Sequence, residues 1–197
     1  MLEEYCKTTI EIARELVGGI SESLGLETCN LERAVDFESC SVLFAANFYP
    51  PCPQPELAMG LPSHSDHCLL TLLLHNQISG LQILHQGNWV NVNPIPNSFL
   101  VHVADQLEIL SNGKYKSVLH RATVNNKATR LSIVMAVRPS PETVVGPAPQ
   151  LLNKLTNPPL LKHIKYIDYM QMVYSSNLQD PTHLSTLNLD LYRMCFY

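Results

Sequence analysis

The sequence predicts a mainly β domain, a sandwich or a barrel, preceded by one long amphipathic helix and followed by a helical segment. From Cys40 onward, short runs rich in Val, Ile, Leu, Phe and Thr recur at regular intervals, and Pro, Gly and Asn separate them. Over residues 2–25, apolar side chains recur three or four residues apart, which predicts a helix. We therefore expect three regions: a helix with its connector over 1–39, a β core over 40–140 and a C-terminal helical extension over 141–197.

The opening helix has acidic residues in its first turn and Gly25 at its end, as helix termini commonly do. Gly18 and Gly19 lie inside it, and each costs about 1 kcal/mol relative to alanine. We therefore expect a kink or a close contact at this position.

The β core is predicted to contain seven strands separated by turns. They are expected at residues 41–49, 69–74, 80–85, 88–92, 98–103, 117–124 and 129–137. The segments 86–88 and 125–127 predict hairpin turns, and the prolines of 50–55 predict a rigid loop. Helices are predicted at 105–112 and 166–175.

The charge pattern argues against several classes of protein. Lys and Arg number 13 against 17 Asp and Glu, and charged residues make up 15% of the chain, below the roughly 25% of typical soluble domains. There is no basic stripe of the kind that binds nucleic acid, no apolar run long enough for a membrane span, and the acidic start differs from a secretory signal. We expect a cytoplasmic protein, or one shared with the nucleus, that binds a small molecule; the oligomeric state stays open.

The six cysteines form no CxxC pair, and without a secretory signal we expect reduced thiols that serve mainly as small packing residues.

Spacing selects three candidate metal ligands among many histidines. His64 and Asp66 are two residues apart, so in a strand both would point to one face. His120 is the best third donor, and two histidines with one carboxylate is the ligand set of non-haem Fe(II) oxygenases. Taken alone, an H-x-D tripeptide is a weak signal. A rival zinc site would combine His64 with Cys52, His67 and Cys68, but it lacks the paired short spacings of structural zinc sites.

Arg130 and Ser132 share a strand face near these ligands. A hairpin at 125–127 would place His120 opposite Ser132 and Ala122 opposite Arg130. An arginine can bind a carboxylate through two hydrogen bonds, and could anchor a small diacid whose other end chelates the metal. A surface salt bridge is the alternative role for Arg130.

Asn47 and Tyr49 lie two residues apart on the strand before the proline loop. With this element in place, the segment from NFYPPCPQPE to RLSI closely resembles the Fe(II)- and 2-oxoglutarate-dependent dioxygenases of plant specialised metabolism and hormone pathways. The resemblance covers residues 40 to about 140, and more weakly to about 175. It implies a double-stranded β-helix, or jelly roll, with these site residues: His64, Asp66 and His120 on Fe(II), and Arg130, Ser132, Tyr49 and Asn47 around 2-oxoglutarate.

The resemblance also implies a reaction. Oxygen and 2-oxoglutarate would be converted to succinate and CO2 while a metabolite or hormone is hydroxylated, desaturated or demethylated, with ascorbate in support. Flavonoids and phenolic acids are the expected substrates, because the flavanone 3-hydroxylase-like and salicylate-hydroxylase-like branches look nearest. Ala45, Ala136 and Arg138 are the candidate substrate contacts; the alternative for the two alanines is ordinary core packing.

Three departures from the family pattern stand out. His102 and Ala104 occupy positions where relatives usually carry Asn and Gly, and we expect a tolerated change at a strand exit. Ala136 replaces an aromatic residue of several relatives. Relatives also carry a long region before the opening helix, so we expect the catalytic core of a longer protein with exposed apolar surface at that helix and at the sheet edge. A truncated, non-catalytic or interaction form that keeps the site residues is the alternative function.

Overall fold

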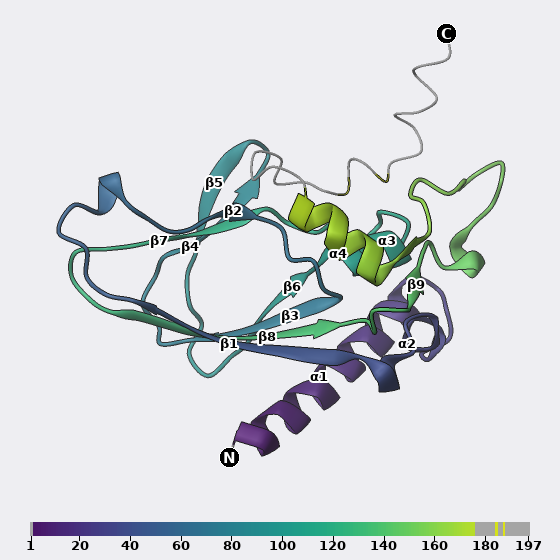
Figure 1. Cartoon of the computed structure of the whole chain (residues 1–197), viewed down its shortest axis with the longest axis horizontal. Helices are drawn as coiled ribbons and strands as arrows, with labels where there is room; N and C mark the ends of the chain where they lie inside the picture. Colours follow the sequence, from purple (N-terminus) through teal and green to yellow (C-terminus); the bar gives the residue numbers. More distant parts are fainter. Residues whose placement is uncertain (1, 176–183, 185–186, 188–197) are drawn as a thin grey trace, which may run out of the picture.

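Two antiparallel four-stranded sheets face each other in the computed structural model, which describes residues 2–175, 184 and 187 (Figure 1). One sheet has the order β1-β8-β3-β6 and the other β2-β7-β4-β5. The strands are β1 (Ser41–Tyr49), β2 (Met59–His64), β3 (Leu70–His75), β4 (Leu81–His85), β5 (Asn88–Val92), β6 (Leu100–Val103), β7 (His120–Thr123) and β8 (Arg130–Arg138), with β9 (Val144–Val145) and β10 (Ile164–Lys165) in a separate ribbon. The helices are α1 (Leu2–Ser23), α2 (Asn30–Ala34), α3 (Asp105–Leu110) and α4 (Tyr166–Ser175).

Apart from the β4–β5 hairpin, successive strands from β1 to β8 alternate between the two sheets, which is the jelly-roll arrangement. The predicted mainly β fold with a helix before it and a helix after it is confirmed. The crossing corrects one prediction, because β7 and β8 lie in different sheets. His120 pairs with His64 of β2, and Ser132 pairs with Asn47 of β1. The predicted hairpin that sets His120 opposite Ser132 is therefore wrong: residues 124–129 carry the chain from one sheet to the other.

The β4–β5 connection is the hairpin that the sequence predicts. His85 pairs with Asn88, which leaves Gln86 and Gly87 as the two turn residues. Both have positive φ, 48° and 78°, the conformation of a type I′ turn that suits the twist of a two-residue hairpin.

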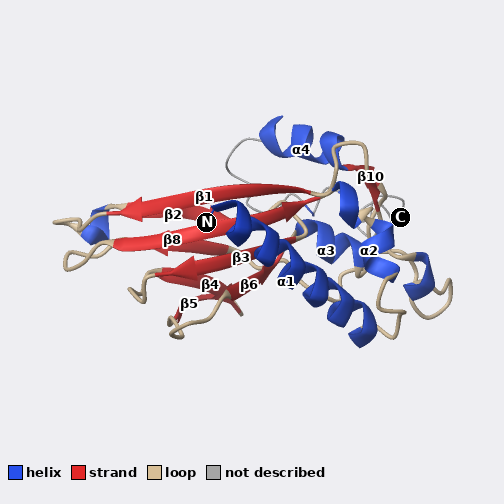
Figure 2. Cartoon of the chain, turned by 90° about the horizontal axis from the view of Figure 1, so that it is seen from below, coloured by secondary structure: helices blue, strands red, loops and turns tan. Residues whose placement is uncertain are grey.

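The hydrophobic core lies on the outer face of the β1-β8-β3-β6 sheet, under α1 (Figure 2). Leu72 and Met135 are register partners on β3 and β8, and both are fully buried, as is Val17 of α1. Because side chains alternate along a strand, Thr71 and Leu73 point to the opposite face. The inner face of this sheet therefore borders the cavity between the two sheets. Gly18 of α1 makes the expected close contact, since a Cβ there would lie 3.0 Å from the Thr28 side chain.

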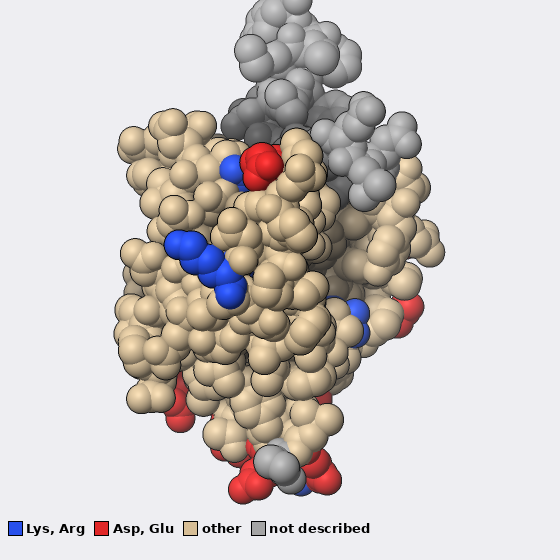
Figure 3. All heavy atoms as spheres, turned by 90° about the vertical axis from the view of Figure 1, so that its left-hand side faces the viewer, with Lys and Arg blue, Asp and Glu red and all other residues tan. Residues whose placement is uncertain are grey.

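Strand β1 forms one edge of its sheet and carries exposed apolar residues. Phe48 is 66% exposed, its register partner Leu131 is 45% exposed, and Leu2 at the start of α1 is 56% exposed. This agrees with the expectation of apolar surface at the opening helix and the sheet edge. Charged side chains are sparse on the face shown in Figure 3.

None of the described helices is long and apolar enough to cross a membrane. The cysteines of the described region, Cys6, Cys29, Cys40, Cys52 and Cys68, are all free thiols, as predicted. Cys195 lies outside the described residues.

Candidate metal and cosubstrate site

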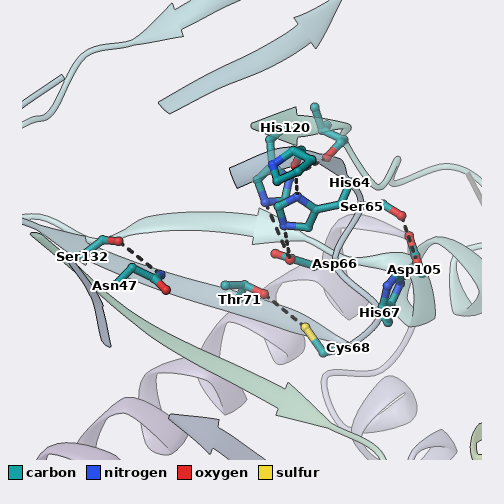
Figure 4. Close-up of polar contacts among 12 residues, drawn as sticks. Asn47, His64, Ser65, Asp66, His67, Cys68, Thr71, Asp105, His120 and Ser132 are labelled. Atoms are coloured by element: carbon teal, nitrogen blue, oxygen red, sulfur yellow. Dashed lines mark hydrogen bonds and ion pairs between the residues drawn. The ribbon is translucent and has the colours of Figure 1, made fainter. Parts of the chain in front are cut away.

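The three predicted metal ligands come together between the sheets. His64 ends β2 and His120 begins β7, and the two residues are register partners. Asp66 follows in the loop after β2, and its Oδ1 atom lies 3.7 Å from Nε2 of each histidine (Figure 4). One potential ligand atom from each residue lies within 4.8 Å of the other two. This spacing suits a shared divalent ion.

Hydrogen bonds to the backbone orient both imidazoles. Nδ1 of His64 lies 2.8 Å from the Pro62 carbonyl, and Nδ1 of His120 lies 3.0 Å from the Val118 carbonyl. A carbonyl can only accept, so Nδ1 of each ring donates and Nε2 keeps its lone pair for a metal. Asp66 Oδ2 is buried and has no hydrogen-bond partner in the described part of the chain, which suits a carboxylate oxygen that binds a metal. The residues therefore fit Fe(II).

The shifts in the pKa of His64 and of Asp66 favour the metal-binding forms of these two groups. Burial lowers the pKa of His64, and the neighbouring His120 lowers it further. Burial opposes ionisation of Asp66, but the surrounding imidazoles and the Thr71 hydroxyl outweigh it, so the Asp66 pKa lies below its ordinary value. Neutral imidazoles and an ionised carboxylate are the states that bind a metal.

The predicted cosubstrate residues lie on the opposite sheet. Along the β1–β8 ladder, Asn47 pairs with Ser132 and Tyr49 pairs with Arg130. Asn47 Nδ2 lies 3.4 Å from Ser132 Oγ, and the Arg130 guanidinium lies 5.1 Å from the centre of the Tyr49 ring. Arg130 and Ser132 are 2% and 3% exposed. The four side chains therefore form one polar group facing the cavity.

Arg130 is a buried cation without an acidic partner in the described part of the chain. None of the ion pairs there includes Arg130, and its Nε is buried without an acceptor. Burial lowers the pKa of its guanidinium, although arginine stays charged in proteins. Because a buried unpaired charge is unfavourable, this position suits an external carboxylate.

One cavity of about 270 Å³ connects the metal ligands with Arg130. The rest of its wall is largely apolar and includes the predicted substrate contact Ala45 together with Leu43, Leu61, Leu73, Leu81 and Val134. The other two candidate contacts are not among the lining residues. Ala136 packs with Cys68 and Ala104, and Arg138 pairs with Ser41 at the far end of β8.

His102 is a cavity residue that the sequence did not identify as part of the site. It lines the cavity beside His120 and is 8% exposed. His102 faces the cavity because it pairs with Thr71, another cavity residue, in the β3–β6 ladder. In the sequence, only the departure of His102 from the family pattern pointed to it. Ala104 has φ −116°, an extended conformation that does not require glycine.

The alternative zinc site is not formed. His67 Nδ1 lies 3.0 Å from Asp105 Oδ2, and the Cys68 thiol lies close to the Leu70 carbonyl and the Thr71 hydroxyl. Among the described residues, only His64, Asp66 and His120 have the geometry of a metal-binding group.

Comparison with known proteins agrees with this geometry. The family model of the 2OG-Fe(II) oxygenase superfamily matches residues 38–139, just over half of the chain. The chain belongs to this superfamily. Fe(II) and 2-oxoglutarate are thus supported both by the family and by the His-Asp-His group.

Curated relatives of this superfamily member include plant proteins. A "2-oxoglutarate-dependent dioxygenase 19" of Oryza sativa subsp. japonica is 43% identical over 94% of the chain and 55% of its own length. A "Flavonol synthase/flavanone 3-hydroxylase" of Petunia hybrida is 45% identical over 85% of the chain and 48% of its own length. "Protein DMR6-LIKE OXYGENASE 1" of Arabidopsis thaliana is 41% identical over 89% and 50%. The chain spans about half the length of these relatives.

Solved structures confirm the jelly-roll fold of the oxygenase. The crystal structure of JOX2 in complex with 2OG, Fe and JA has a TM-score of 0.89 and 32% identity, over 95% of this chain and 55% of JOX2. A dioxygenase for auxin oxidation in rice has a TM-score of 0.82 and 26% identity, over 95% of this chain and 62% of its own.

Proposed function

We propose that the chain is an Fe(II)- and 2-oxoglutarate-dependent oxygenase that oxidises a small, largely apolar plant metabolite, with flavonoids as the substrate class. The supporting observation is that the His64, Asp66 and His120 donors share one cavity with the Arg130 guanidinium, which has no acidic partner among the described residues. In this proposal, residues 40–140 form the oxygenase core, and 1–39 and 141–197 flank it. A cytoplasmic or shared cytoplasmic and nuclear location belongs to the same proposal, and imaging of a fluorescent fusion tests it.

Each side chain has a defined task in this reaction. His64, Asp66 and His120 would hold the metal, and backbone hydrogen bonds fix the two imidazole rings for this role. Arg130 and Ser132 bind the distal carboxylate of 2-oxoglutarate, while Tyr49 and Asn47 shape that end of the cavity. When bound, Fe(II) couples oxygen to the conversion of 2-oxoglutarate into succinate and CO2 and to oxidation of a substrate C–H bond. The apolar wall excludes water from the reacting atoms.

The choice of flavonoids rests on the charges of the wall. Arg130 is committed to 2-oxoglutarate. Arg121, the other cation beside the cavity, donates from Nε to Gln82 at 2.7 Å and lies 4.2 Å from the centre of the Trp89 ring. The described lining residues therefore offer no uncommitted cation for an anionic substrate such as salicylate, and an uncharged ring system fits better. The similarity to a flavonol synthase/flavanone 3-hydroxylase supports the same class.

Succinate release is the direct test. The purified chain is assayed with Fe(II), ascorbate and 2-oxoglutarate, with either a flavanone, a dihydroflavonol or salicylate. We expect flavonoid-dependent succinate that His64→Ala and Asp66→Ala abolish, whereas His85→Ala, an exposed histidine of the β4–β5 hairpin, retains it. Full turnover in a His64→Ala, Asp66→Ala double variant would reject the metal assignment, and turnover of salicylate alone would reject the flavonoid class.

The non-catalytic alternative gives a different result in thermal melting. A cooperative transition that Fe(II) plus 2-oxoglutarate raises is expected of the oxygenase, since ligands that bind only the folded state stabilise it. A broad transition that these ligands leave unchanged would favour a fragment without catalytic function.

A further inference from the structure

A polar cluster lies directly behind the loop that carries Asp66, and its centre is Asp105. This first residue of α3 is fully buried. Its Oδ2 atom lies 3.1 Å from Ser65 Oγ, 3.0 Å from His67 Nδ1 and 2.6 Å from the Tyr169 hydroxyl (Figure 4 shows the first two). Three polar groups from two separate parts of the chain thus converge on one oxygen.

The direction of these hydrogen bonds follows from the chemistry of the groups. An ionised carboxylate has only acceptor sites, so each neighbour must donate. Ser65 and Tyr169 donate their hydroxyl protons, and His67 carries its proton on Nδ1. Burial, and then Asp105 itself, raise the pKa of Tyr169, so this group stays a phenol. Hydrogen bonds to a charged acceptor are stronger than neutral ones, and a buried carboxylate needs them.

The backbone of α3 adds further bonds to the same loop. The N–H of Asp105 donates to the Asp66 carbonyl at 2.9 Å, and the N–H of Gln106 donates to the Cys68 carbonyl at 3.0 Å. Gln106 Nε2 lies 3.3 Å from the His67 carbonyl. The backbone of Asp66 and of the two residues after it is thus tied to α3, while the Asp66 side chain lies toward His64 and His120.

We propose that Asp105 is a positioning residue that sets the direction in which Asp66 presents its carboxylate to the metal, and that Tyr169 links this control to α4. Asp105 bonds to Ser65 and His67, the two neighbours of Asp66, and it does not line the cavity. It therefore acts through the loop. The inference rests on the proposed function, because it assumes that Asp66 binds a metal.

The two tyrosines of α4 provide a matched pair of variants. Tyr169→Phe removes the hydroxyl that bonds to Asp105 and keeps the buried ring. Tyr166→Phe removes a hydroxyl that is also buried but has no hydrogen-bond partner among the described residues. Two further variants change other members of the cluster: Asp105→Asn replaces the central carboxylate, and Ser65→Ala removes a second hydroxyl that bonds to it. If Asp105→Asn fails to fold, Tyr169→Phe and Ser65→Ala still decide the question.

The readout is Co(II) binding to the whole chain, measured by titration and by the visible absorption of the bound ion, with melting as a check on folding. We expect Tyr169→Phe and Asp105→Asn to weaken Co(II) binding about 10- to 100-fold, the range for outer-shell changes at metal sites, and to alter the absorption. Ser65→Ala should do so to a smaller degree, and Tyr166→Phe should match the unmodified protein.

Unchanged Co(II) affinity and absorption in Tyr169→Phe, Asp105→Asn and Ser65→Ala would overturn the proposal, even if melting temperatures fell, because the cluster would then serve stability alone. An unmodified chain that binds Co(II) through His64 but releases no succinate would reject the oxygenase activity and leave this inference standing. Co(II) binding that is insensitive to His64→Ala would reject both.

Discussion

The imidazole of His102 stacks on that of His120, with ring centres 4.4 Å apart and planes inclined by 28°. Burial, and then the neighbouring His120, lower the pKa of His102 to about 4. A neutral ring can lie against a metal ligand without adding a repulsive positive charge beside the metal. His102 thus limits the rotation of the His120 ring, whose Nδ1 is already held by the Val118 carbonyl.

We therefore expect His102→Ala to weaken Co(II) binding by about 10-fold or more, a typical effect of losing an outer-shell partner. Titration of the metal-free protein gives the affinity. His85→Ala serves as the control, since this exposed histidine lies in the β4–β5 hairpin. Equal Co(II) affinities in the two variants and the unmodified chain would show that the stacking does not orient the ligand.

Arg130→Ala should separate the cosubstrate from the metal. Loss of one partner of a buried charge pair costs about 2–5 kcal/mol, so 2-oxoglutarate should bind at least about 30-fold more weakly. Arg130→Lys, which keeps the charge but loses the two-pronged geometry, should lie in between. Calorimetric titration of 2-oxoglutarate into the Co(II)-loaded protein measures this effect. If Arg130→Ala weakens Co(II) and 2-oxoglutarate binding equally, the role of carboxylate anchor is wrong.

Because Gly80 has no side chain, it leaves room for the Arg130 side chain in its observed position. Its φ is +152°, and a Cβ there would lie 2.8 Å from the Thr123 carbonyl and 3.0 Å from Arg130 Cδ. Overpacking of this kind costs about 1–3 kcal/mol of folding stability. Because the added Cβ would displace the Arg130 side chain, Gly80→Ala should also weaken 2-oxoglutarate binding in the same calorimetric titration, with Co(II) binding retained.

Gly87→Ala is the matched control for this substitution. Gly87 also has a positive φ, +78°, but no atom lies within 4 Å of its added Cβ. It should lower the free energy of unfolding by about 1 kcal/mol and leave 2-oxoglutarate binding unchanged. A similar loss of binding in both variants would mean that backbone strain, and not contact with Arg130, is responsible.

Two thiols should resist alkylation in the folded protein. Burial, and then Asp36, raise the pKa of Cys40 to about 12, and burial also raises the pKa of Cys68. The thiolate is the reactive form, so iodoacetamide at pH 8 should modify both residues far more slowly in the native state than in urea. Peptide mass spectrometry gives the rates.

The same shifts have a consequence for stability. Because the folded state keeps these thiol protons while the unfolded state loses them above about pH 8.5, stability should fall as the pH rises from there toward 12. Native rates for Cys40 and Cys68 equal to those in urea would contradict the buried environment.

The sequence pattern predicted most of the helices and strands, whereas the metal ligands were proposed from residue spacing together with the family resemblance. Residues 41–49 and 88–92 form strands with the predicted bounds, because both are short runs rich in apolar, β-branched and aromatic residues that end just before proline-containing loops. Strand β2 escaped prediction, since Gly60 and Pro62 interrupt the apolar pattern there. His64, the last residue of that strand, could be recognised only through its spacing from Asp66.

Tertiary relationships were harder to predict. The turn at 125–127 indicated a reversal of the chain but not that the next strand enters the other sheet, so the pairing of His120 was wrong. The contact between Asp105 and Tyr169 joins residues far apart in the sequence, and no local pattern predicts it. Ala136 and Arg138 were chosen by strand alternation alone, which gives the face of a residue but not its depth in the cavity.

The division of the site between the two sheets has a mechanical consequence. His64 and His120 belong to the β2-β7-β4-β5 sheet, whereas Arg130 and Ser132 belong to the β1-β8-β3-β6 sheet. In the proposed binding mode, a 2-oxoglutarate molecule would span from the metal ligands on one sheet to Arg130 on the other, so its fixed length would have to match the separation of the two sheets. Substitutions at distant residues that change the separation of the two sheets would then weaken 2-oxoglutarate binding, even though those residues contact neither the metal ligands nor Arg130.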